Sequence, residues 1–171
     1  MTVLRKDPLL VGSLRYNRLT EKIDVTKVLW WNKEPCVLTN KGRKALRYFF
    51  EKYYGLFNES VMDDALDLEA YSKEYHPICE YLETLEWDGK ERIRNVLKVY
   101  MGADDSDMVY EMLKHFMMGA LNRIYCPGCK FDEMLCLVGQ QGAGKSTFFR
   151  FLALDDQWFS DSLKNLNMEK P

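Results

Sequence analysis

Apolar side chains recur with a helical period over residues 107–125. They return every three or four residues, which is the spacing of one face of an α-helix. Asp107 and the polar residues before it can cap the start of this helix, and Pro127-Gly128 stops it near Tyr125. The apolar face consists of Met108, Val109, Met112, Leu113, Phe116, Met117, Ala120, Leu121 and Ile124. We predict that this is the longest helix of the chain.

A second strong helical pattern runs from Lys41 to Tyr54, with Thr39 or Asn40 as the N-cap and Gly55 at its end. Its apolar face contains Ala45, Leu46, Phe49, Phe50 and Tyr53. Weaker helical patterns cover residues 58–74, 78–85 and 92–101. Most of the chain is therefore predicted to be helical.

Alternating apolar and polar residues predict strands in a few short stretches. Leu14, Tyr16, Ile23 and Val25 suit a half-exposed hairpin. Residues 134–138 are an apolar run that we expect to form a buried strand, and residues 157–160 resemble the start of another. The predicted fold class is α/β with a mainly α-helical N-terminal region. We expect residues 86–171 to hold a helical lead-in and an incomplete α/β core, truncated after its first strand–loop–helix unit.

The residues after the expected strand fit a phosphate-binding loop. The pattern G-x-x-x-x-G-K-[ST] lies at Gly139–Ser146, between the strand and a helical segment, and chance matches usually lack that context. Glycines let backbone N–H groups curl around phosphate oxygens, and the helix N-terminus attracts anions. We expect Lys145 to reach the β- and γ-phosphates, Ser146 to ligate Mg²⁺ and Thr147 to contact the α-phosphate. The candidate nucleotide-binding residues are Gly139, Gln140, Gln141, Gly142, Ala143, Gly144, Lys145, Ser146 and Thr147.

The alternative to a phosphate site is a Gly-rich turn in an α/β domain, with a lysine on its surface. That alternative leaves the three glycines and the Gly-Lys-Ser run unexplained together. A P-loop kinase or GTPase is a further possibility, although no guanine-specificity motif is visible.

Composition and charge narrow the class of protein. The chain has 171 residues, 47% of them hydrophobic, and no apolar run long enough for a membrane span. Five cysteines without a disulfide-like framework fit a reducing cytosol, so we expect a cytoplasmic protein. The Cys126-Pro-Gly-Cys129 pair lacks a second pair of zinc ligands, and two thiols in a turn are the simpler interpretation.

We expect a mainly helical, basic accessory region at 1–85 and the ATPase part at 86–171.

The net charge of −2 hides an uneven distribution. Residues 1–60 hold 12 Lys and Arg against 6 Asp and Glu, whereas residues 61–171 hold 12 against 20. Four basic residues of the second helical pattern, Lys41, Arg43, Lys44 and Arg47, are candidates for contacts with nucleic-acid phosphate. The alternative is a solvated basic face on an ordinary helix. A non-enzymatic DNA-binding or interaction fragment is accordingly our second hypothesis for function.

A working P-loop NTPase needs a second acidic motif at the end of an apolar strand. After Ser146 the only acidic residues are Asp155, Asp156, Asp161 and Glu169, and none follows such a strand. No arginine follows Arg150. We therefore expect nucleotide binding without a complete set of catalytic residues, and negligible hydrolysis by this chain alone.

Several segments in order resemble the virulence-associated protein E family. They are the turn Trp87-Asp88-Gly89 with Arg92, then Gly119 and Arg123, then Pro127-Gly128 with Lys130, Phe131 and Asp132, then the loop at 139–148, and last the segment 158–161. The resemblance spans about residues 75–163.

The resemblance implies a P-loop ATPase related to superfamily-3 helicases, with an AAA+-like NTPase core that is incomplete in this chain and that uses ATP and Mg²⁺. Such proteins are carried by phages and mobile elements of bacterial hosts and are thought to unwind DNA, usually as hexameric homo-oligomers. The resemblance thus implies DNA and further copies of the chain as partners, and no membrane.

Overall fold

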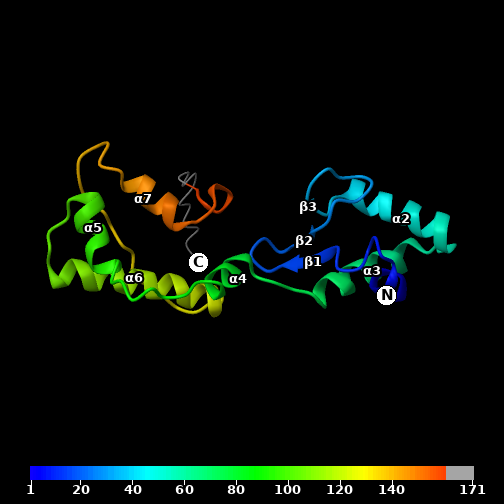
Figure 1. The fold of residues 1–171 in the computed structure, drawn as a ribbon, viewed down its shortest axis with the longest axis horizontal. Coiled ribbons are helices and arrows are strands. Elements are labelled where there is room, and N and C mark those ends of the chain that lie inside the picture. The colour runs from blue at the N-terminus through cyan, green and yellow to red at the C-terminus, as the bar shows by residue number, and fades with distance from the viewer. Residues whose placement is uncertain (161–171) are drawn as a thin grey trace, which may run out of the picture. The chain divides into compact units, whose positions relative to one another are not determined.

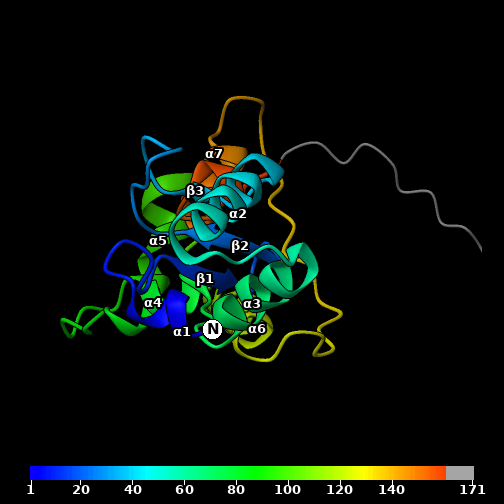
Figure 2. The ribbon, with the colours of Figure 1, turned by 90° about the vertical axis from the view of Figure 1, so that its right-hand side faces the viewer.

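The structure is a computed structural model that describes residues 1–160, and these form an α/β fold with seven helices and one three-stranded antiparallel sheet (Figures 1 and 2). The chain divides into two compact units, Met1–Glu86 (unit 1) and Trp87–Pro171 (unit 2). Among the helices of the described residues, none is long and apolar enough to cross a membrane.

The sheet belongs to unit 1 and follows the strand order β1-β2-β3. Strand β1 (Leu14–Asn17) and strand β2 (Lys22–Val25) form the hairpin that the sequence predicts, with Leu14 opposite Val25 and Tyr16 opposite Ile23. Strand β3 (Cys36–Val37) pairs with the end of β2. The sequence pattern does not predict β3, because two residues are too few to show an alternation.

Four helices complete unit 1: α1 (Thr2–Lys6), α2 (Asn40–Tyr54), α3 (Glu59–Tyr71) and α4 (Pro77–Glu83). The ends of α2 confirm the prediction, since the Thr39 side chain accepts a hydrogen bond from the Gly42 N–H and Gly55 ends the helix in the left-handed conformation. The Asn58 side chain caps α3 in the same way, through the Val61 N–H. Local sequence signals thus place both helices.

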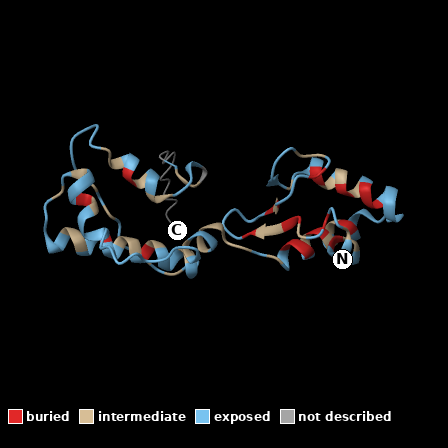
Figure 3. Ribbon diagram, in the orientation of Figure 1, coloured by how far each residue is buried: buried red, intermediate tan, exposed pale blue. Residues whose placement is uncertain are grey.

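Unit 1 has a dense apolar core (Figure 3). Helix α3 packs against β1, and the rings of Tyr16 and Tyr71 lie 4.4 Å apart between their centroids. Val25, Leu46 and Leu66 are completely buried. The buried residues of this core are Leu4, Leu10, Leu14, Ile23, Val25, Leu29, Leu46, Phe49, Phe50, Met62, Leu66 and Ala70. Such burial provides the main favourable term in folding.

Unit 2 contains helix α5 (Ile93–Met101), helix α6 (Asp107–Tyr125), helix α7 (Lys145–Leu152) and a short 3-10 helix, η1 (Asp156–Trp158). Helix α6 confirms the longest predicted helix, and the Ser106 side chain caps it by accepting from the Val109 N–H. The buried core of unit 2, among its described residues, consists of Leu97, Leu113 and Phe148. Helices α5, α6 and α7 each supply one of these side chains.

Two strand predictions are wrong. Residues 134–138 are extended but form no strand, and residues 157–160 hold part of η1 instead. A strand needs a neighbour for its backbone N–H and C=O groups. Unit 2 supplies no such neighbour among residues 87–160, so Leu135 and Leu137 pack on the core while Met134 and Val138 stay 81% and 97% exposed. The strand–loop–helix unit is therefore an extended segment, a loop and a helix.

Candidate phosphate-binding site

The loop at 139–144 leads directly into the N-terminus of α7. Gly142 and Gly144 have φ angles of +84° and +78°, a left-handed conformation that glycine adopts without strain. Gly144 is the N-cap of α7, and no side chain caps this end of the helix. The N–H groups of the first turn are thus open to an anion, and the helix dipole favours negative charge there.

Lys145 folds back over the loop. Its Nζ donates hydrogen bonds to the backbone oxygens of Gly139, at 2.8 Å, and Gln140, at 2.7 Å. The Lys145 side chain therefore links the end of the loop to the two residues where the loop begins. Its ammonium group lies beside the loop, where a phosphate oxygen could replace either carbonyl as its partner.

Helix α7 is fixed by its aromatic residues. Phe148 is buried, and Phe149 makes an edge contact with Phe116 of α6, with 5.9 Å between ring centroids. Ser146 and Thr147 lie in the first turn of α7 and are exposed. The remaining candidate residues, Gln140, Gln141, Gly142 and Ala143, are exposed as well. The structure thus brings all nine predicted nucleotide-binding residues into one loop and one helical turn.

The segment that leads into the loop is held against α6 at Phe131. Gly119 makes room for this ring, because a Cβ atom at Gly119 would lie 2.2 Å from it. One turn further along α6, the Arg123 Nη2 atom donates a hydrogen bond of 2.7 Å to the Phe131 backbone oxygen. The ring of His115 lies on the preceding turn, 5.3 Å from the Phe131 ring between centroids. These three residues of α6 therefore set where the chain starts towards the loop.

One family model matches this part of the chain. The virulence-associated protein E-like domain covers residues 82–170, more than half of the sequence. The chain belongs to this family. Membership indicates a protein of a phage or another mobile element. No curated protein matches the chain.

Within the VapE-like domain, one of the acidic residues after the loop, Asp156, forms an ion pair with a neighbouring arginine. Both carboxylate oxygens of Asp156 accept hydrogen bonds of 2.6 Å from Arg150, which hold the pKa of Asp156 below its ordinary value. Asp161 and Glu169 lie outside the described residues. Among residues 1–160, no group of three or more His, Cys, Asp or Glu side chains is placed to hold a metal ion. The role of Ser146 as a ligand for Mg²⁺ stays a prediction.

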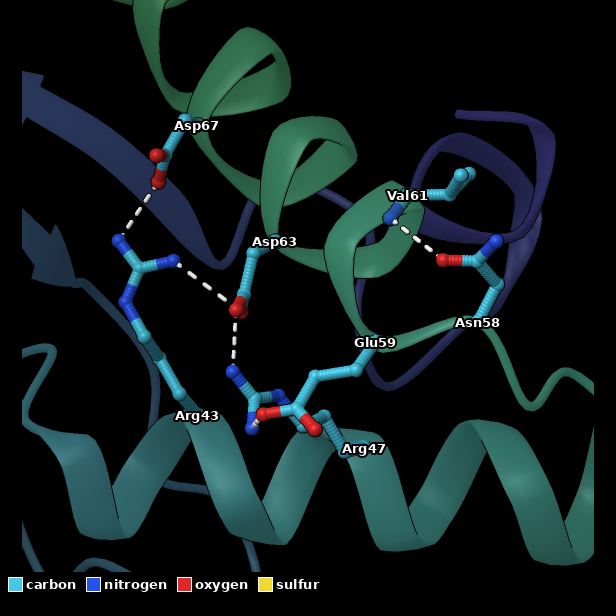
Figure 4. Close-up of polar contacts among 7 residues, drawn as sticks. All are labelled: Arg43, Arg47, Asn58, Glu59, Val61, Asp63 and Asp67. Carbon is cyan, nitrogen blue, oxygen red and sulfur yellow. Dashed lines mark hydrogen bonds and ion pairs between the residues drawn. The ribbon is translucent and has the colours of Figure 1, made fainter.

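The basic helix α2 precedes the VapE-like domain, and its arginines are engaged within unit 1 (Figure 4). Arg43 donates to Asp67 at 2.6 Å and to Asp63 at 3.4 Å. Arg47 pairs with Asp63 and with Glu59. Burial acts to lower the pKa of Arg43, but the hydrogen bonds and charges of Asp67 and Asp63 outweigh burial and raise the pKa. The arginines join α2 to α3, a role that the local sequence pattern does not reveal.

Lys41 and Lys44 are exposed on α2. Contacts of α2 with nucleic acid stay a prediction, and the two lysines are better placed for it than the two arginines. The cysteines of the Cys126–Cys129 turn are both free thiols.

Proposed function

We propose that this chain binds ATP and Mg²⁺ at the loop of residues 139–147, as the nucleotide-binding part of a phage or mobile-element replication ATPase of the helicase type. The observation that carries the proposal is the position of Lys145. Its ammonium group lies over the loop next to the uncapped N-terminus of α7, so two sources of positive charge meet there. Membership of the VapE-like family supports the same function.

Each residue of the loop has a role in this proposal. The backbone N–H groups from Gly142 to Thr147 bind phosphate oxygens, and Lys145 exchanges its carbonyl partners for the β- and γ-phosphates. Ser146 supplies one oxygen ligand to Mg²⁺, which neutralises phosphate charge when bound. Phe148 and Phe149 keep α7 on the core, so the loop is pre-organised for the ligand.

Hydrolysis requires a base or a residue that positions water. Among the acidic residues after the loop, Asp156 comes well after Ser146 in the sequence. Both of its carboxylate oxygens already accept hydrogen bonds from Arg150. We accordingly propose that the chain binds nucleotide but turns it over negligibly by itself. A Mg²⁺-dependent release of phosphate from ATP at a rate typical of helicases would contradict this part of the proposal.

Titration calorimetry with MgATP tests the phosphate site. Lys145→Ala should weaken binding at least about tenfold, because a charge-assisted contact is lost. Lys114→Ala is the matched control, since Lys114 is an exposed lysine of unit 2 that pairs with Glu111. The control should bind like the unmodified chain. Equal affinity of all three proteins, or no binding to any of them, would refute the site.

Unwinding of DNA by a homo-oligomer, a hexamer in the family, is the wider role that the resemblance supports. Light scattering of the chain with MgATP and a single-stranded oligonucleotide tests it. Assembly that depends on Lys145 would support the wider role, whereas a monomer under all conditions would restrict the proposal to nucleotide binding.

A further inference from the structure

Helix α2 of unit 1 carries a second row of polar residues, separate from its two arginines. Arg43 and Arg47 turn towards the acids of α3 (Figure 4). Four other residues follow one another at spacings of three and four, which places them on one stripe of the helix. They are Lys41, Lys44, Tyr48 and Lys52, and all four are exposed. The stripe runs for about 16 Å along the helix axis.

Exposed aromatic rings extend this stripe to one side. The Trp30 ring stacks on the Phe49 ring, with 4.6 Å between centroids and 25° between planes, and the Tyr53 ring lies 4.9 Å from Phe49. Phe49 is buried in the core of unit 1, so it fixes both neighbours while they stay exposed. We call this surface the outer face of α2, and it consists of Trp30, Lys41, Lys44, Tyr48, Lys52 and Tyr53.

The three lysines of the outer face have no acidic partner. Within residues 1–160, no ion pair joins any of them to a carboxylate, whereas each arginine of α2 pairs with two acids. Glu51 is exposed nearby on the helix and pairs with none of them. The Lys52 Nζ atom lies 5.7 Å from the ring centroid of Tyr48 and 5.2 Å from that of Tyr53. The face therefore presents positive charge among aromatic rings.

This combination fits a single strand of nucleic acid better than other polyanions. Lysines attract phosphates, and exposed rings stack on bases, which a duplex keeps covered by its own base pairs. An anionic lipid surface also attracts lysines, but stable binding needs apolar side chains that enter the bilayer. Leu46, Phe49 and Phe50, the large apolar residues of α2 that would serve this purpose, are buried in the core.

We propose that the outer face of α2 binds a single strand of DNA or RNA. The bases stack on the rings of Trp30, Tyr48 and Tyr53, and the phosphates lie at the three lysines. Lys52 exchanges its aromatic neighbours for a phosphate oxygen, because its side chain is long and flexible. The face precedes the VapE-like domain at 82–170 and needs no nucleotide in the loop, so the inference does not rest on the proposed binding of ATP.

Fluorescence anisotropy of labelled oligonucleotides tests the outer face, with the full chain and without ATP. Strands of about 12 deoxythymidines or uridines should bind more tightly than a DNA duplex of the same length. Tyr48→Ala should weaken binding of the strand about fivefold or more, because a stacking surface is lost. Tyr48→Phe keeps the ring and should bind like the unmodified chain. Lys41→Ala and Lys44→Ala should each reduce the slope of log affinity against log salt by about 0.7.

Tyr81→Ala and Lys22→Ala are the matched controls. Tyr81 on α4 and Lys22 on β2 are exposed residues of unit 1 outside the outer face. Both variants should bind the strand like the unmodified chain. Tyr48→Ala should also keep the affinity for MgATP in calorimetry, so the outer face and the phosphate site stand or fail separately.

Binding of either strand that depends on the Tyr48 ring supports the proposal, and the tighter strand identifies DNA or RNA as the partner. Unchanged affinity in Tyr48→Ala, an equal loss in Tyr81→Ala, or equal affinity for strand and duplex would overturn it. Absence of binding to both strands would overturn it as well. If the chain then bound vesicles of phosphatidylserine and phosphatidylcholine, the face would serve a membrane instead.

Discussion

The two units are almost equal in length, but they bury very different amounts of apolar side chain. Unit 1 buries twelve apolar residues in one core, whereas unit 2 buries three among its described residues (Figure 3). Met134, Val138 and Phe151 of unit 2 are 81%, 97% and 77% exposed. Core packing therefore stabilises unit 1, while unit 2 presents the candidate phosphate-binding loop on a sparsely buried framework. The larger apolar core and the candidate site lie in different units.

The extended segments of the two units show the same contrast. Strand β1 finds a partner a few residues later in β2, because the turn between them closes a short loop at low entropic cost. Residues 134–138 have a more continuously apolar sequence than β1 but no strand partner among the described residues. An apolar run predicts where a strand can form, and a partner decides whether it does.

The largest effect that tests this comparison should come from the core of unit 1. Leu66→Ala removes a completely buried side chain and should lower the free energy of unfolding by about 3 kcal/mol. Leu113→Ala, at an equally buried position of unit 2, should cost less because few buried neighbours surround it. Urea unfolding, monitored through the hydrogen exchange of peptides from each unit, measures the loss of stability in both variants.

Leu68→Ala is the control for the first variant, since Leu68 lies on the same helix and is 59% exposed. It should change stability little. If Leu113→Ala were as costly as Leu66→Ala, the two units would not differ in the way that their burial suggests.

A second test concerns a tight contact within unit 2. Gly119→Ala places a Cβ atom 2.2 Å from the Phe131 ring, and displacing the ring should cost about 2 kcal/mol. The change should also weaken binding of MgATP, because Phe131 directs the chain towards the loop. Thermal unfolding and calorimetry of the same samples measure the two effects.

Phe131→Ala provides the control for this contact in a double-mutant cycle. Once the ring is gone, Gly119→Ala should no longer destabilise the chain, because alanine is favoured over glycine inside a helix by up to about 1 kcal/mol. Additive effects of the two changes would contradict a clash between Gly119 and Phe131 and would place the cost of the alanine elsewhere.

The sequence predicts the features of this fold that depend on neighbouring residues. The helical period at 107–125, the Thr39 cap and the hairpin at Leu14–Val25 are local signals, and all three are confirmed. The glycines and the lysine of residues 139–146 predict a phosphate-binding loop, and that binding stays a prediction. The family match at 82–170 agrees with the segments that resemble the family.

Contacts between distant residues escape the local pattern. Arg43 and Arg47 are basic residues on a helix and resemble a surface for phosphate, yet their acidic partners lie 12 to 24 residues further along the chain. Gly119 and Phe131 belong to the segments that resemble the family, but only the structure shows that they touch.

The smallest expected effect concerns a charged group that unit 1 buries. Glu69 is 2% exposed and pairs with Arg5 and Lys73. Burial acts to raise its pKa, but the hydrogen bonds and charges of Lys73 and Arg5 outweigh burial and hold the pKa of Glu69 below its ordinary value. Glu69→Gln should lower the stability of unit 1 by about 1 kcal/mol at neutral pH, because both cations remain partly in solvent.

The pH dependence of this loss follows from the lowered pKa of Glu69. The ionised carboxylate stabilises the folded chain above the carboxyl pKa of the unfolded chain, and its contribution disappears as the pH falls through the lower folded pKa. Urea unfolding of both proteins between about pH 7 and about pH 3 should therefore show two curves that converge in acid. The control is Asp88→Asn in unit 2, where hydrogen bonds from Arg92 lower the pKa of Asp88 to about 2 in an exposed pair. Added salt should screen the effect of that exposed pair and leave most of the Glu69 effect. If salt removed both effects equally, Glu69 would behave as a surface charge and the contrast between the units would not extend to their ion pairs.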